Sequence, residues 1–319
     1  MTKELQDIIR AYEARRGEKF ALATLVRTQG SSYRRPGARL LIATDGSYVG
    51  ALSGGCLEEE VAARAQTVIA NGVPAELHFD TRLRYGCNGA IDILVEKLSR
   101  GFLEGVAEAF RARRVCFAAT DSLGSRLLHS VGEALNDAFV QEIAPPLQLL
   151  LIGAGPDSPA LRAFAQTLGW KVIETEEAAA LPNDFDEWTA AIVKTHNYGR
   201  DFAALQRLLP LGLRYVALLG PRRRRDRLLQ ALAEAGLETR SGFFAPAGLD
   251  LGAEAPEQIA LAMVAEIQSV FAHARGESLR ERKAPIHSPV AQVSNLRGAV
   301  SPRHQPGLRK LKTCATIDS

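Results

Sequence analysis

Long hydrophobic runs are missing from this chain of 319 residues. No segment approaches the roughly 20 apolar residues that a membrane-spanning helix requires. The first residues, MTKELQDIIRAYEARRGEK, show an amphipathic and charged pattern that differs from a secretory signal peptide. The sequence therefore predicts a cytoplasmic protein that has no membrane partner.

Cysteine is also scarce, and its four copies form no CxxC pair. Their spacing predicts no disulfide framework. Cys116 lies in the apolar segment RVCFAAT, which predicts a core position, and Cys314 lies in a polar tail. The other two, Cys56 and Cys87, each follow glycine in a predicted loop. A zinc site built from these two and His78 would lack a fourth ligand, so we rank zinc last.

The body of the chain lacks an excess of positive charge. Residues 283–319 carry +5, whereas the whole chain carries only +3, so the remaining residues carry −2. The sequence therefore gives no indication of a nucleic-acid partner. The basic tail contains four prolines and little apolar periodicity, and we expect it to be disordered.

Periodicity divides the rest of the chain into an α/β arrangement with two domains. Residues 1–100 predict a mixed α/β domain, and residues 101–146 predict a connecting segment that ends at Ala144-Pro145-Pro146. Residues 147–275 alternate strands and helices, which is typical of a Rossmann-like parallel sheet. Residues 276–319 form the basic tail.

The expected elements can be placed from apolar spacing and turn residues. In the first domain we expect helices at 3–16 and 57–71, and strands at 20–28, 38–43, 48–53, 75–80 and 90–98. In the second we expect strands at 147–154, 171–175, 190–195 and 214–220, helices at 158–168, 200–209 and 222–236, and a last helix from Pro256.

The segment Ser53-Gly54-Gly55-Cys56 places a thiol between a predicted strand and a predicted helix start. Free N–H groups and the helix dipole favour a thiolate there, and the two glycines allow a ligand to approach the backbone. The alternative is that Ser53 caps the helix and Cys56 is a small hydrophobic residue. A second loop, Gly86-Cys87-Asn88-Gly89, has the same composition. Both loops suit a small anionic or sulfur-bearing ligand.

The second domain begins with Gly153-Ala154-Gly155, which follows a buried strand and precedes a helix, as in a dinucleotide fingerprint. Glu174 lies near the position of a ribose-binding acid. Ser158 replaces the third glycine, however, and Pro156 and Pro159 remove backbone donors. The pattern favours a Rossmann-like fold and argues against NAD(P) as cofactor.

Three further loops follow strands of the same sheet, where open α/β sheets bind ligands. His196-Asn197 could supply an acid, a base or a ligand contact. Gly220-Pro221-Arg222 opens an arginine-rich helix that favours an anion such as phosphate, and Arg222 is the arginine we expect to contact it. Asp250 lies in a glycine-rich loop that could cover the same crevice.

The motifs occur together in an order that resembles the XdhC/CoxI family. GSSYRRPGARLLIATDG, GALSGGCLEEEV and GCNGAIDILVE resemble the family's N-terminal domain. IGAGPDS, VKTHNYGRD, LLGPRRRRDRLL and GLDLGAEAPEQIALAMVAEI resemble its C-terminal Rossmann domain. The resemblance covers residues 1–287 approximately and leaves out the tail.

This resemblance implies an accessory protein that binds the molybdenum cofactor, assists its sulfuration and delivers it to a molybdenum hydroxylase of the xanthine, aldehyde or carbon monoxide dehydrogenase type. The cargo would be molybdopterin, with or without a cytosine nucleotide. The implied partners are the apo-hydroxylase, a cysteine desulfurase and a second copy of the chain. We therefore expect a chaperone rather than an enzyme. The alternative is an NAD(P)-dependent oxidoreductase that uses His196 as acid or base.

Carried onto this sequence, the resemblance implies a cofactor site in the crevice between the two domains. The thiolates of Cys56 and Cys87 would face the molybdenum, and the Rossmann loops would hold the phosphate. The expected contacts are Ser53, Gly54, Gly55, Cys56, Gly86, Cys87, Asn88, Gly89, Gly153, Gly155, His196, Asn197, Gly220, Arg222 and Asp250.

Overall fold

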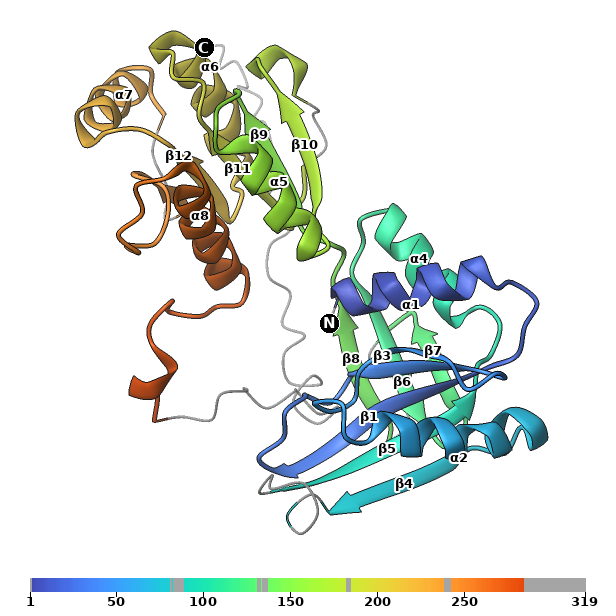
Figure 1. Cartoon of the computed structure of the whole chain (residues 1–319). Coiled ribbons are helices and arrows are strands. Elements are labelled where there is room, and N and C mark those ends of the chain that lie inside the picture. Colours follow the sequence, from blue (N-terminus) through green and yellow to red (C-terminus); the bar gives the residue numbers. More distant parts are fainter. Residues whose placement is uncertain are drawn as a thin grey trace, which may run out of the picture.

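The computed structural model describes residues 2–80, 82, 89–130, 133, 137–181, 185–237 and 242–283. It has two domains, an N-terminal one with two antiparallel sheets and a C-terminal one with a parallel sheet (Figure 1). The α/β fold class and the Rossmann-like second domain that the sequence predicts are confirmed. No helix among the described residues has the length and apolar character that crossing a membrane requires.

The N-terminal domain contains a five-stranded sheet in the order β3-β2-β1-β5-β4 and a three-stranded sheet in the order β7-β6-β8. Its elements are α1 (Thr2–Ala14), β1 (Phe20–Gly30), β2 (Arg39–Ala43), β3 (Tyr48–Gly50), α2 (Glu58–Asn71), β4 (Ala75–Asp80), β5 (Gly89–Lys97), α4 (Phe102–Arg111), β6 (Cys116–Asp121), β7 (Gly124–Leu128) and β8 (Phe139–Ile143).

Alternation along the strands gives the five-stranded sheet two buried faces. Ala21, Ala23 and Leu25 of β1 pack with α2, whereas Phe20 and Leu22 pack with α1, α4 and the smaller sheet. Segment 101–146, expected only to connect the domains, thus forms α4 and three strands that share the core of the N-terminal domain. The periodicity of this segment is too short and interrupted to show that it packs on an earlier sheet.

The C-terminal sheet is entirely parallel, in the order β10-β9-β11-β12-β13. Its elements are β9 (Gln148–Ile152), α5 (Ser158–Thr167), β10 (Lys171–Thr175), η2 (Ala178–Ala180), β11 (Thr189–Val193), α6 (Tyr198–Leu208), η3 (Leu209–Leu211), β12 (Tyr215–Leu218), α7 (Arg222–Glu234), β13 (Phe243–Phe244), α8 (Pro256–Phe271) and η4 (Leu279–Glu281). The strand order reverses between β9 and β11, and doubly wound sheets bind ligands at the carboxyl ends of such neighbours.

The predicted elements are found within a few residues of their expected ends, and the differences have local causes. Helix α6 begins at Tyr198 rather than at residue 200, because the Asn197 side chain accepts a hydrogen bond from the N–H of Arg200 and caps the helix. Strands β8 and β13 were not expected. Each depends on pairing with a distant strand, β8 with β6 and β13 with β12.

The amino-terminal edge of the parallel sheet faces the N-terminal domain. The Gln6 side chain of α1 donates to the carbonyl oxygen of Gly169 at 3.1 Å, just before β10. Arg113, after α4, forms an ion pair with Asp186 at 2.6 Å and donates to the carbonyl of Trp188, just before β11. Accordingly, α1 lies on the side of its domain toward the Rossmann domain, and α2 lies on the opposite side (Figure 1).

This arrangement overturns the expectation of one cofactor crevice between the two domains. The Rossmann loops follow the carboxyl ends of the strands, one strand length, or about 15 Å, from the edge that meets the N-terminal domain. The loop before α2 lies on the other side of the N-terminal sheet from α1. The two sets of loops therefore do not face each other within one chain. Sequence motifs locate loops along the chain, but they do not fix the orientation of one domain on another.

Candidate functional site

The loop that carries Cys56 is organised around the hydroxyl group of Ser53. The Ser53 Oγ accepts hydrogen bonds from the N–H groups of Gly55 and Cys56, both at 3.1 Å, and of Leu57 at 3.3 Å. The expectation that Ser53 caps the start of the helix is confirmed in this sense, although α2 itself begins five residues later, at Glu58. The hydroxyl thereby bends the backbone of the loop back on itself.

The buried carboxylate of Glu58 fixes the same loop from the other side. Its oxygens accept from the N–H groups of Leu52 at 2.9 Å, Ser53 at 2.7 Å and Leu57 at 3.1 Å, and from the Ser53 hydroxyl at 2.6 Å. Burial raises the pKa of Glu58, but these hydrogen bonds outweigh burial and hold the pKa below its ordinary value of 4.5. An internal anion thus already occupies the donors that the sequence assigned to a thiolate or a ligand.

Replacing Glu58 by glutamine should lower the free energy of unfolding at pH 7 by about 1–3 kcal/mol, because an amide nitrogen would face the N–H of Leu57. Since folding lowers the pKa of Glu58, the carboxylate contributes fully above pH 4.5 and loses its contribution as the pH falls through the folded pKa. Urea unfolding of both proteins at neutral and acidic pH tests this expectation. A difference that grows toward acid would contradict it.

Cys56 is exposed, as are Gly54 and Gly55 before it. A Cβ atom added at Gly55 would meet nothing within 4 Å, and one at Gly54 would meet only the Tyr33 ring, at 4.0 Å. The alternative of a buried, hydrophobic Cys56 is therefore wrong. The loop presents a thiol and bare backbone to solvent beside the ring of Tyr33, which is itself 69% exposed.

The second thiol loop lies largely outside the described residues. Gly86, Cys87 and Asn88 are not described, and Gly89 is the first residue of β5. A Cβ atom at Gly89 would lie 2.4 Å from the carbonyl oxygens of Gln29 and Ser31, so only glycine fits there. Residues 29–33 therefore touch both Gly89 and Gly54. The described end of the second loop lies close to the first, at the same end of the sheet.

At the carboxyl edge of the parallel sheet, Gly153 lies against the end of β11. It has a φ of 97°, and an added Cβ atom would lie 2.6 Å from the Cα of Thr195 and 2.8 Å from the carbonyl oxygen of Lys194. Gly155 follows, where an added Cβ atom would lie 3.7 Å from the Nε2 of His196. The structure thus brings together the glycine loop and the His196 loop, as expected for neighbouring strands at a switch point.

A buried lysine lies beneath these loops. The Lys194 side chain has no exposed surface, and its Nζ lies 2.6 Å from the Ser158 Oγ and 3.3 Å from the Asp157 Oδ1. The other oxygen of Asp157 is buried without a hydrogen-bond partner among the described residues. The residue that replaces the third fingerprint glycine therefore binds an ammonium group of the protein itself.

The remaining Rossmann-side residues occupy the same edge. His196 is exposed and has a φ of 55°, which is unusual for a residue other than glycine. Asp201 is fully buried, accepts from the Thr195 hydroxyl at 2.5 Å and pairs with Arg224. The structured arginine of the 222–225 run is thus Arg224. Arg222 and Asp250 are exposed, and neither side chain forms a hydrogen bond or an ion pair within the described part of the chain.

Two side chains that the sequence assigned to ligands are engaged elsewhere. Glu174, near the position of a ribose-binding acid, accepts from the Arg162 Nη1 at 3.0 and 3.1 Å. His78 lies 2.6 Å from Asp92 through its Nδ1. Among the described residues, no three His, Cys, Asp or Glu side chains come together in a way that would hold a metal ion.

Comparisons with known proteins agree with this two-domain arrangement. The model of the XdhC and CoxI family matches residues 13–80, and the model of the XdhC Rossmann domain matches residues 149–267. The chain belongs to the XdhC and CoxI family. The resemblance found in the sequence is thereby confirmed, and the matched segments contain the Cys56 loop and the carboxyl-edge loops up to Asp250.

Several relatives of this XdhC and CoxI family member span most of its length. A probable xanthine dehydrogenase subunit of Bacillus subtilis is 29% identical over 310 residues, which cover 78% of this chain and 92% of that protein. A molybdenum cofactor insertion chaperone of Escherichia coli, PaoD, is 28% identical and covers 82% of this chain and 86% of its own. A crystal structure described as a xanthine dehydrogenase from Bacillus halodurans has a TM-score of 0.74 at 25% identity and covers 88% and 98% of the two chains.

Sequence reasoning missed Lys194, Glu58 and Arg224 as site residues of this family member. Lys194 and Glu58 are charged residues at the ends of apolar segments, where a solvent-exposed position is the usual expectation. Their zero and 3% exposure is visible only in the fold. The signal that was available is that each is the nearest charged residue to a glycine loop, directly after Val193 or directly after Leu57.

Proposed function

We propose that this chain binds the molybdenum cofactor as cargo, assists its sulfuration and delivers it to an apo molybdenum hydroxylase. The observation that carries the proposal is the exposed Cys56 thiol on an open glycine loop, in a chain whose relatives include a protein named as a molybdenum cofactor insertion chaperone. Thiolates suit soft metals and the relay of a persulfide sulfur.

The geometry of the loop supports the binding of a large planar cargo. Gly54 and Gly55 leave the backbone open, and the Tyr33 ring beside Gly54 offers a face for a pterin. Ser53 and Glu58 hold the loop from inside, so Cys56 needs no rearrangement to reach a ligand. The negative charge of Glu58 keeps a second anion away from the loop's own N–H groups, which leaves sulfur as the contacting atom.

The proposal includes a cysteine desulfurase as the sulfur donor and a second copy of the chain as partner. Within one chain the carboxyl-edge loops, with His196 and Arg222, lie away from the Cys56 loop. A homodimer could bring the Rossmann loops of one copy to the Cys56 loop of the other, so that phosphate and metal ends of one cargo are held by two copies. Gly153, Gly155, Asn197, Gly220 and Asp250 remain predicted contacts on that edge.

The experiment is anaerobic mixing of the purified protein with molybdenum cofactor, followed by gel filtration and quantification of molybdenum and pterin. Co-elution near one equivalent per chain is expected for the wild type. The C56A variant should bind about tenfold more weakly, which corresponds to about 1.4 kcal/mol. The matched control is C116A, which removes a half-buried thiol whose pKa is raised by burial.

Three outcomes decide between the possible functions. Loss of cofactor in C56A with retention in C116A supports the proposal. Equal retention in both variants, together with equal activation of a client hydroxylase, removes Cys56 from the function. Absence of cofactor binding beside measurable NADH binding would instead favour the oxidoreductase, with His196 as its acid or base.

A further inference from the structure

Strand β4 forms one edge of the five-stranded sheet, with β5 as its neighbour. It is six residues long and contains no proline. Among the described residues, no other strand pairs with its outer side. Such a row of open N–H and C=O groups is a template for an added strand, and natural proteins usually cover or block it.

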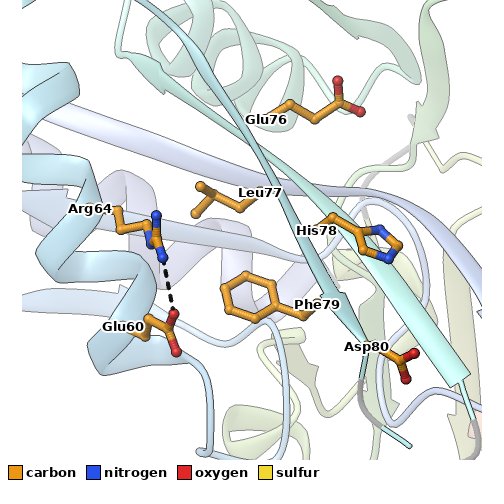
Figure 2. Close-up of a pocket in the computed structure, with 7 residues that line it drawn as sticks. All are labelled: Glu60, Arg64, Glu76, Leu77, His78, Phe79 and Asp80. Atoms are coloured by element: carbon orange, nitrogen blue, oxygen red, sulfur yellow. Dashed lines mark hydrogen bonds and ion pairs between the residues drawn. The ribbon is translucent and has the colours of Figure 1, made fainter.

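A groove of about 330 Å³ runs beside this edge, between β4 and α2. Figure 2 shows Leu77 and Phe79 pointing toward α2, while Glu76 and His78 point to the other side of the strand. The lining residues include three carboxylates, those of Glu60, Glu76 and Asp80, and only one arginine, Arg64. An added strand would therefore need an apolar face toward α2 and a basic face beside Glu76.

The carboxylates of this groove differ in how far they are neutralised. Glu60 pairs with Arg64 at 3.5 Å, and Asp80 pairs with Arg82. Glu76 is exposed, and its side chain forms no hydrogen bond or ion pair in the described part of the chain. It is thus the position at which a basic side chain gains most.

The tail of the same chain contains a segment with the required pattern. In residues 309–317, RKLKTCATI, Lys310 and Lys312 alternate with Leu311 and Thr313. In an extended strand these two pairs point to opposite faces. The chain between Lys283 and Arg309 reaches up to about 85 Å when extended, which exceeds the size of a small domain. The described chain ends just after η4, which lies toward the N-terminal domain (Figure 1).

We infer that residues 309–317 add to the outer edge of β4 as a sixth strand of the same chain. Leu311 and Thr313 lie beside Leu77 and Phe79 under α2, and Lys310 and Lys312 lie on the face of Glu76 and His78. This self-docking covers an open sheet edge and holds the basic tail on the N-terminal domain. It does not depend on the proposed cargo.

Hydrogen exchange on the full-length protein tests this inference, followed on peptides that contain residues 75–80. The variant K310E/K312E should exchange its β4 amides at least tenfold faster than the wild type. The matched control R297E/R303E changes the tail charge by the same amount outside the segment, and should exchange like the wild type. Adding E76K to K310E should restore slow exchange.

Equal exchange in all four proteins would overturn the inference, because the tail would then not cover the edge. Equally fast exchange in both charge variants would also overturn it, because general charge rather than the segment would matter. Protection that falls on tenfold dilution of the wild type would show that a second copy, rather than the same chain, occupies the edge. Concentration-independent protection that only K310E/K312E removes supports it.

Discussion

Replacing Lys194 by methionine is expected to lower the free energy of unfolding of the Rossmann domain by about 3–5 kcal/mol. The lysine is fully buried, and it is the cation beside Asp157, which is only 3% exposed. One Asp157 oxygen already lacks a hydrogen-bond partner among the described residues. Without the ammonium group, the carboxylate would remain buried and charged with no partner for either oxygen. Both tryptophans, Trp170 and Trp188, lie in this domain, so urea unfolding followed by their fluorescence reports on it.

The control for this variant is K171M, which removes an exposed lysine on neighbouring β10 and should change stability by less than about 0.5 kcal/mol. The double variant K194M/D157N should recover part of the loss, because no buried charge is left unpaired. Strictly additive effects of the two substitutions would show that Lys194 and Asp157 are not energetically coupled.

Replacing Gly153 by alanine is expected to cost about 3 kcal/mol or more in the same assay. Two causes add. A φ of 97° is unfavourable for a residue with a side chain, and the new methyl group would lie 2.6–2.8 Å from backbone atoms of Thr195 and Lys194, which cannot move without shifting β11. The glycine loop and the His196 loop would be forced apart, and ligand binding at this edge should weaken with them.

Gly236 provides a matched control in the same domain. It also has a positive φ, of 75°, but an added Cβ atom would meet nothing within 4 Å. The variant G236A should therefore show the backbone cost alone, about 1–2 kcal/mol. Equal losses in G153A and G236A would mean that close packing against β11 contributes nothing.

Much of the fold could be predicted from the sequence because periodicity and turn residues are local signals. The strand before Gly153 and the helix after it follow from a continuous apolar run and a glycine break, and both are present. Strand β8 could not be predicted in this way, because it depends on pairing with β6, which lies well before it in the chain. The orientation of the domains depends on a few contacts such as Arg113 with Asp186, which no motif encodes.

The candidate site divides along the same line. Glycine loops, an exposed Cys56 and the cap at Ser53 could be inferred from residue type and spacing. The role of Glu58 could not, because a glutamate in the first turn of a helix normally serves the helix dipole from the surface. Here the fold turns its carboxylate inward onto the preceding loop. The sequence-based assignment of free donors beside Cys56 failed for that reason.

The openness of the Cys56 loop has a consequence for timing. Gly54, Gly55 and Cys56 are exposed, and nothing lies near the Cα of Gly55 on its open side. A molecule attached to this loop can leave without local unfolding or the movement of a covering segment. Its residence time is then set by the bonds it makes itself, and chiefly by those to sulfur. A client that competes for those bonds could take the molecule directly, so the speed of transfer would depend on the acceptor's concentration.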